Sequence, residues 1–193
     1  PRADAMTRAP IAAEFIRESR PLPAALWQSL TGFADEHKLG WPDLLLAGGT
    51  SKASLWRNDS ATGDALRFSK IQAGVELGGV TGAWPLDVDS DGITDLALLR
   101  VGENVLLRGL GDCRFERANE AWGFDGGDAW SSAFAATWEA GATLPTLAIG
   151  NYIDRAQDAF PWGSCTDNWL HRPDGPRYTA PRPRPPSFCA LSM

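Results

Sequence analysis

A pattern of residues recurs along this chain at intervals of about 50 residues. Residues 35–49 read DEHKLGWPDLLLAGG and residues 87–102 read DVDSDGITDLALLRVG, so that Asp43 corresponds to Asp95. Each of these two segments is followed by a Leu-x-Arg sequence, then by a Gly-Asp pair and an Arg-aromatic pair. A fainter third copy occupies residues 138–178. Three features that return in the same order indicate a fold built from repeated units.

Each repeat contains short segments that predict β-strands. Apolar and β-branched runs alternate with clusters of Gly, Asp and Asn, which is typical of an all-β chain. The predicted strands are residues 43–49, 53–58, 66–70, 95–102, 104–109, 113–118, 130–137, 146–152, 168–172 and 177–180. A period near 50 with about four short strands per unit is typical of a propeller blade. The sequence therefore predicts an all-β fold, a partial β-propeller of about three four-stranded blades.

The limits of the blades follow from the repeat. We expect blades over about residues 31–80, 81–130 and 131–193. Before them, residues 1–30 hold four prolines and only a weak helical pattern, which predicts an irregular N-terminal extension. A proline-rich stretch at residues 176–188 interrupts the third repeat, so we expect a polyproline II segment or a sheet edge there.

Four aspartates are crowded into residues 87–95, directly before an apolar run. Carboxylates this close repel one another unless a cation lies between them, and a calcium site built from one loop needs carboxylates at alternate positions. Gly92 permits the sharp turn of such a loop. The predicted ligands are the side chains of Asp87, Asp89, Asp91 and Asp95 and the backbone carbonyl of Ile93. A solvated acidic turn without a metal is the alternative that these residues also allow.

An EF-hand opens with the same spacing, but the rest of the sequence excludes it. An EF-hand requires a glutamate at position 12 of the loop, where this chain has Leu98. It also requires a helix on each side, whereas residues 96–108, LALLRVGENVLLR, predict two strands.

The D-x-D-x-D-G-x-x-D-L loop, followed by a Leu-x-Arg strand and repeated, resembles the FG-GAP/VCBS repeats of integrin-alpha-type β-propellers. The segments WSSAFA, LAIGNYID, CTDNWLHRP and CALSM further resemble bacterial secreted relatives of the cartilage acidic protein (ASPIC/UnbV-associated) group. The resemblance covers about residues 31–193 and implies a calcium ion with a structural role in the second repeat. His37 and Leu39 replace carboxylates in the first repeat, and the third repeat has lost the motif.

The number of repeats predicts that this chain does not act alone. Propellers of the family usually need about seven blades to close, and three are expected here. An open stack leaves strand edges and an apolar face uncovered. We therefore expect further blades or a protein partner to cover that face, with the chain a subunit or fragment of a larger protein. The net charge of −6 disfavours nucleic acid as partner, and no run approaches the ~20 apolar residues that span a bilayer.

Three cysteines, Cys113, Cys165 and Cys189, form no CxxC or other zinc-binding spacing. A disulfide between Cys165 and Cys189 would close a loop of about 24 residues and stabilise the fold by roughly 3 kcal/mol. The alternative is three reduced, buried thiols. The disulfide is favoured, which predicts an extracytoplasmic location, periplasmic or secreted.

The signals for catalysis are weak. The sequence contains no GxSxG, HExxH, P-loop or GxGxxG motif. His171 is a candidate general base, although a surface histidine is the simpler interpretation, and the nine tryptophans either line a sugar-binding face or pack between blades. We expect a non-enzymatic, calcium-stabilised module that mediates protein–protein interaction or assembly. The alternative is the scaffold of a secreted enzyme or carbohydrate-binding propeller whose active residues lie outside this chain.

Overall fold

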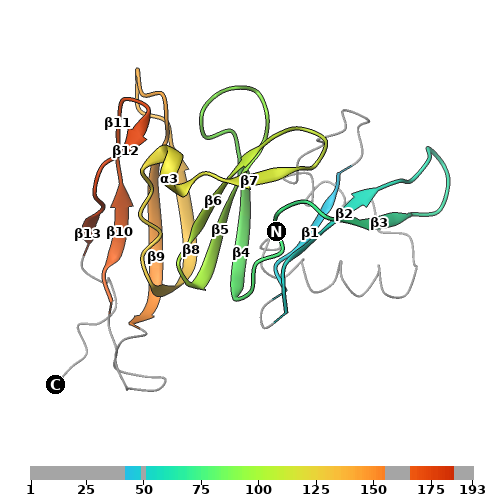
Figure 1. Ribbon diagram of the computed structural model, residues 1–193, viewed down its shortest axis with the longest axis horizontal. Coiled ribbons are helices and arrows are strands. Elements are labelled where there is room, and N and C mark those ends of the chain that lie inside the picture. The colour runs from blue at the N-terminus through green and yellow to red at the C-terminus, as the bar shows by residue number, and fades with distance from the viewer. Residues whose placement is uncertain (1–41, 49–50, 155–165, 185–193) are drawn as a thin grey trace, which may run out of the picture.

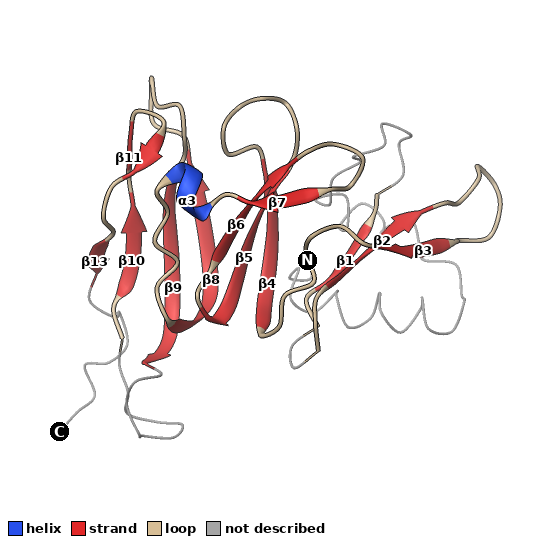
Figure 2. Cartoon of the chain, viewed as in Figure 1, coloured by secondary structure: helices blue, strands red, loops and turns tan. Residues whose placement is uncertain are grey.

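The computed structural model describes residues 42–48, 51–154 and 166–184, and these segments form antiparallel β-sheets and one short helix (Figures 1 and 2). None of the described sheets closes on itself. The prediction of an all-β fold is therefore confirmed.

Three consecutive groups of elements, called here the first, second and third units, follow one another along the chain. The first unit contains β1 (Leu44–Leu46), β2 (Ser54–Asn58) and β3 (Phe68–Ile71). The second contains β4 (Val80–Leu86), β5 (Asp95–Gly102), β6 (Val105–Gly109), β7 (Phe115–Arg117) and the helix α3 (Asn119–Trp122). The third contains β8 (Ala129–Thr137), β9 (Thr146–Asp154), β10 (Asn168–His171), β11 (Pro173–Asp174), β12 (Arg177–Tyr178) and β13 (Arg182–Arg184).

The second and third units share one eight-stranded sheet, in which β5 carries the contact between them. Strands β4, β5, β6 and β7 pair in that order, and β8 pairs with the end of β5 through Val101↔Trp130 and Gly102↔Ala129. Beyond β8 the order continues through β9 and β10 to β13 (Figure 1). The first unit forms its own three-stranded sheet.

The pairing of strands repeats from unit to unit. The strand pairs β1–β2, β5–β6 and β9–β10 correspond to one another in the repeat. In each pair, residues at equivalent positions of the repeat lie opposite each other. The matching pairs are Leu44↔Trp56, Leu96↔Leu107 and Leu147↔His171, followed further along by Asn58↔Phe68, Gly109↔Phe115 and Pro173↔Tyr178. The repeat in the sequence is thus a repeat of strand pairing as well.

Two hydrophobic clusters lie on opposite faces of β5. Leu96 and Leu98 pack in the cluster shared with the first unit, whereas Ala97 and Leu99 pack in the cluster shared with the third. Successive side chains of a strand point to opposite faces, so a strand buried on both faces needs an unbroken apolar run, as β5 has. The second unit is therefore packed between the other two.

Strand β4 is not among the predicted elements, and neither are the short helix α3 and the two-residue strand β11. Strand β4 contains Gly82 and Pro85, both of which disfavour a strand interior, and its register shifts between Val80 and Gly82. Among the described strands β4 pairs only with β5, and proline is tolerated on an edge because no ladder bond is lost there. At the other end of this sheet, β13 lies in the proline-rich stretch, which agrees with the sheet-edge alternative.

Candidate metal centre

The loop between β4 and β5 folds around Asp87. The two side-chain oxygens of Asp87 accept hydrogen bonds from the backbone N–H groups of Asp91 (3.1 Å) and Gly92 (3.0 Å). Ser90 and Gly92 have φ values of 59° and 84°, so the chain reverses through two left-handed residues. This carboxylate thereby turns the loop back on its own beginning.

Asp95 fastens the loop to two strands. It begins β5 and is fully buried, and its Oδ2 accepts from the N–H of Val88 (2.7 Å) while its Oδ1 accepts from the N–H of Gly109 (2.8 Å). Burial raises the pKa of Asp95 to about 6, although the two N–H donors partly oppose that shift. A cation beside this carboxylate would favour its ionised form.

Asp89 differs from Asp87 and Asp95 because one of its carboxylate oxygens accepts no hydrogen bond from the described residues. Its Oδ2 accepts from the guanidinium of Arg108 (2.7 Å). Its Oδ1 is buried and has no hydrogen-bond partner among the described residues. Leaving a buried charged oxygen unpaired is costly, so this atom is the one most suited to a ligand.

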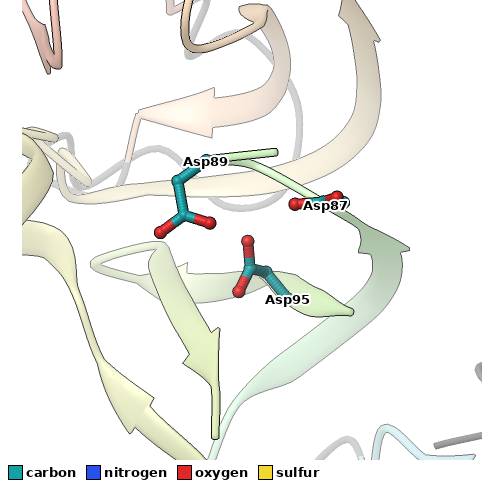
Figure 3. A group of neighbouring side chains, drawn as sticks. All are labelled: Asp87, Asp89 and Asp95. Atoms are coloured by element: carbon teal, nitrogen blue, oxygen red, sulfur yellow. The ribbon is translucent and has the colours of Figure 1, made fainter. Parts of the chain in front are cut away.

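Asp87, Asp89 and Asp95 come together in space. Each offers one carboxylate oxygen, and these oxygens lie within 4.8 Å of one another. Figure 3 shows the three side chains around a common space. A set of ligands made only of carboxylate oxygens suits a hard cation such as calcium or magnesium, and the unpaired Oδ1 of Asp89 fits that interpretation.

Two of the five predicted ligands lie outside this triad. The Oδ1 of Asp91 accepts from the N–H of Ile93 (2.8 Å), which is a local turn within the loop. Coordination by Asp91 and by the carbonyl of Ile93 stays a prediction.

In the first unit Asp43 occupies the position of Asp95 and, like it, binds a backbone N–H group of the next strand. This residue is 6% exposed, and its Oδ1 accepts from the N–H of Asn58 (2.8 Å), as Asp95 accepts from Gly109. Its Oδ2 accepts from the thiol of Cys113 (3.0 Å), on the turn before β7. From the sequence, Asp95 is predicted only as a metal ligand; the signal for this second role is that the first repeat keeps Asp43 although His37 and Leu39 replace two carboxylates of its loop. The residues that replace the ligands, His37 and Leu39, lie outside the described residues.

In the third unit an ion pair occupies the corresponding place. Thr146 begins β9 as Asp95 begins β5, and its hydroxyl donates to Glu139 Oε1 (2.8 Å). The guanidinium of Arg172 lies 3.5 Å from the same oxygen. The loop before β9 therefore has one carboxylate paired with one arginine, whereas three carboxylates lie close together at the start of β5 and in the loop before it.

A second candidate site is a small pocket of about 10 Å³, close to the volume that one water molecule needs, at the junction of the second and third units. His171 lines it, is 1% exposed, and has no hydrogen-bond partner on either ring nitrogen among the described residues. The interpretation of His171 as a surface histidine is therefore wrong. Burial among the rings of Phe124, Trp169 and Tyr178 lowers its pKa to about 4. Trp169 is partly buried and packs against the cluster between the second and third units.

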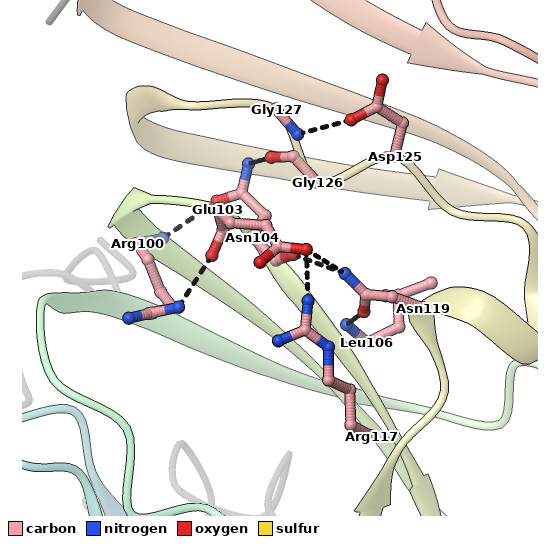
Figure 4. Close-up of polar contacts among 9 residues, drawn as sticks. All are labelled: Arg100, Glu103, Asn104, Leu106, Arg117, Asn119, Asp125, Gly126 and Gly127. Carbon is pink, nitrogen blue, oxygen red and sulfur yellow. Dashed lines mark hydrogen bonds and ion pairs between the residues drawn. The ribbon is translucent and has the colours of Figure 1, made fainter.

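Asn104 holds the wall of this pocket together (Figure 4). Its side-chain NH₂ donates to the carbonyl of Gly126 (3.0 Å) and to the hydroxyl of Ser131 (2.9 Å), and its Oδ1 accepts from the N–H of Arg100 (2.9 Å). Asn119 donates to the backbone carbonyl of Asn104 (2.9 Å). The side chains of Asn104 and Asn119 are thus engaged within the wall, whereas the two ring nitrogens of His171 have no hydrogen-bond partner among the described residues.

No protein-family model matches this chain, and no curated protein matches it significantly. Cys165 and Cys189 lie outside the described residues, so their disulfide stays a prediction. Within the described part of the chain, no helix has the length and apolar character needed to cross a membrane.

Proposed function

We propose that this chain is a non-enzymatic, calcium-stabilised module of β-propeller type that mediates protein–protein interaction or assembly within a larger extracytoplasmic protein. The observation that carries the proposal is the carboxylate triad with its one unpaired buried oxygen, on the loop of the middle of three matching units. The matching strand pairing and the packing of the units on both faces of β5 support an arrangement of blades.

Charge and ligand chemistry favour a divalent ion of calcium's kind. Three ionised carboxylates and the guanidinium of Arg108 sum to a charge of −2, which one divalent cation neutralises. Calcium accepts many oxygen ligands in irregular geometry, whereas magnesium retains more water. Asp87, Asp89 and Asp95 would hold the ion, and Asp91 and the carbonyl of Ile93 are the candidates to complete its shell.

The role of the ion would be structural. Asp87 and Asp95 accept hydrogen bonds from backbone N–H groups of the loop and of β6, so these two carboxylates already take part in holding the local fold together. When bound, a cation relieves the repulsion among the carboxylates that shape the loop. The loop would then hold β4 and β5 in the alignment that the neighbouring units pack against.

The test is the thermal stability of the Asp89→Ala variant in calcium and in chelator. Calcium at a hundred times its dissociation constant stabilises a protein by about 2.7 kcal/mol. We expect the variant to lose most of that gain in calcium and to differ much less from the unsubstituted protein in chelator, as measured by calorimetry.

The matched control is Glu139→Ala, which removes the carboxylate that pairs with Arg172 in the third unit. Its effect on the melting temperature should be equal in calcium and in chelator. Equal losses for Asp89→Ala in the two buffers, or no response of the unsubstituted protein to calcium, would contradict the proposal.

A further inference from the structure

Arg108 is held beside the carboxylate triad from two sides. Its NH2 donates to Asp89 Oδ2 at 2.7 Å, and its guanidinium carbon lies 5.2 Å from the centre of the Trp122 ring. Trp122 is 3% exposed and packs in the cluster between the second and third units. A guanidinium over an indole face is attracted by the ring and has few alternative positions. The positive charge of Arg108 is therefore a fixed part of the site.

The same position carries an arginine paired with an acid in every unit. Arg57 Nε lies 2.7 Å from Asp59 Oδ1 in the first unit, and Arg172 lies 3.5 Å from Glu139 in the third. The third unit needs no further cation, because one arginine balances its one carboxylate. The second unit has two carboxylates more, so its arginine balances only part of the charge.

We propose that Arg108 is an internal counter-ion of the metal loop: it keeps the loop folded when the site is empty and weakens the binding of calcium when the ion is present. This inference rests on the proposed calcium site for its second half only. A fixed positive charge next to the site compensates Asp89 without an ion, and it repels a divalent cation that approaches the same carboxylate. Arg108 thereby sets the calcium concentration at which the loop responds.

The geometry also determines how Arg108 acts on the site. Within the described part of the chain its polar contact is with Asp89 Oδ2, which leaves Asp89 Oδ1 for the space shared with Asp87 and Asp95. Arg108 is thus a positioning residue as well as a charge. Glutamine at this position keeps an NH₂ donor but removes the charge, so the two roles can be separated.

The experiment measures calcium affinity by titration calorimetry and the melting temperature in chelator for Arg108→Gln on the full chain. We expect a dissociation constant about tenfold lower, because a unit charge and a divalent ion a few ångströms apart in water repel by roughly that factor. In chelator we expect a lower melting temperature, since Asp89 then lacks its counter-ion. The matched control Arg172→Gln removes the equivalent pair of the third unit and should leave calcium affinity unchanged.

The outcomes separate this inference from the proposed function. Absence of calcium binding to the unsubstituted protein overturns the proposed function, while a lower melting temperature of Arg108→Gln in chelator still supports the counter-ion role. Unchanged or weaker calcium binding by Arg108→Gln overturns the proposed effect on affinity. A double variant, Arg108→Gln with Asp89→Asn, should be no less stable in chelator than Asp89→Asn alone, because the two residues act through one contact. Additive losses would overturn that coupling.

Discussion

At the scale of single residues, the aspartates of the loop between β4 and β5 and their counterpart in the first unit divide into two kinds. Asp95 and its counterpart Asp43 are buried and accept backbone N–H groups of the neighbouring strand. Such carboxylates fasten the start of one strand to the end of the next, and they are needed with or without a metal. Asp89 instead keeps an oxygen without a partner among the described residues. The fastening role explains why the first repeat retains its aspartate although its loop has lost carboxylates.

Another buried polar residue, His171, predicts an acid-sensitive stability. The pKa of its imidazole is about 4 in the folded protein and 6.5 when exposed, because burial disfavours the charged ring. Above pH 6.5 both states hold a neutral ring, so this contribution is complete. As the pH falls from 6.5 towards 4, only the unfolded state takes up the proton, and stability is lost. At pH 5 we expect a loss of about 2 kcal/mol from this residue, measured by denaturant unfolding.

The control is His171→Phe, which keeps a ring among Phe124, Trp169 and Tyr178 but cannot be protonated. Burial raises the pKa of Asp95 to about 6, so that group also titrates on acidification, and the informative quantity is the difference in pH dependence between this variant and the unsubstituted protein. A variant that loses as much stability on acidification as the unsubstituted protein would show that His171 is not the sensitive group.

At the scale of elements, β6 approaches the loop between β4 and β5 closely at Gly109. A Cβ added at Gly109 would lie 2.2 Å from the carbonyl oxygen of Thr94. The obstacle is backbone and cannot rotate away. We expect Gly109→Ala to destabilise the protein by about 1–3 kcal/mol, as for an overpacked core, and to weaken calcium binding because Thr94 must shift.

Gly78→Ala serves as the comparison for that change. No atom lies within 4 Å of a Cβ built at Gly78, and its φ is outside the left-handed range. We expect a change in stability within about 0.5 kcal/mol, measured by the same thermal melts. Equal effects of the two substitutions would show that the contact between β6 and the loop is not tight.

The elements also show where the sequence was informative. Strands such as β5 and β6 were predictable because a short, unbroken apolar run bounded by Gly and Asp is typical of a buried strand. Strand β4 was not predictable, since Gly82 and Pro85 disfavour a strand and its partner residues in β5 lie nine to twenty positions away. The triad was predictable from spacing, which is local. The contacts of Asp89 with Arg108 and of Asp43 with Cys113 join residues far apart in sequence, and no local pattern encodes them.

At the scale of the whole molecule, the three units are joined by two apolar clusters, and the sheets remain open. Strands β3, β7 and β13 each pair with a single neighbour among the described strands. The unpaired N–H and C=O groups of an edge strand can pair with another chain. In β13 a proline removes one N–H donor, which disfavours such pairing. The exposed large apolar side chains among the described residues are Leu46, Leu110, Trp138 and Tyr152.

The last prediction concerns the state of the chain in solution. Burial of apolar area is what offsets the entropy of ordering a chain, and open sheets forgo part of that burial. Because further blades or a protein partner would complete the proposed propeller, the isolated chain should self-associate or bind an apolar-surface dye. Light scattering at several protein concentrations and dye fluorescence in calcium measure the two effects. A cooperatively melting monomer that binds no dye would mean that the three units suffice on their own, and the proposed assembly would then be wrong.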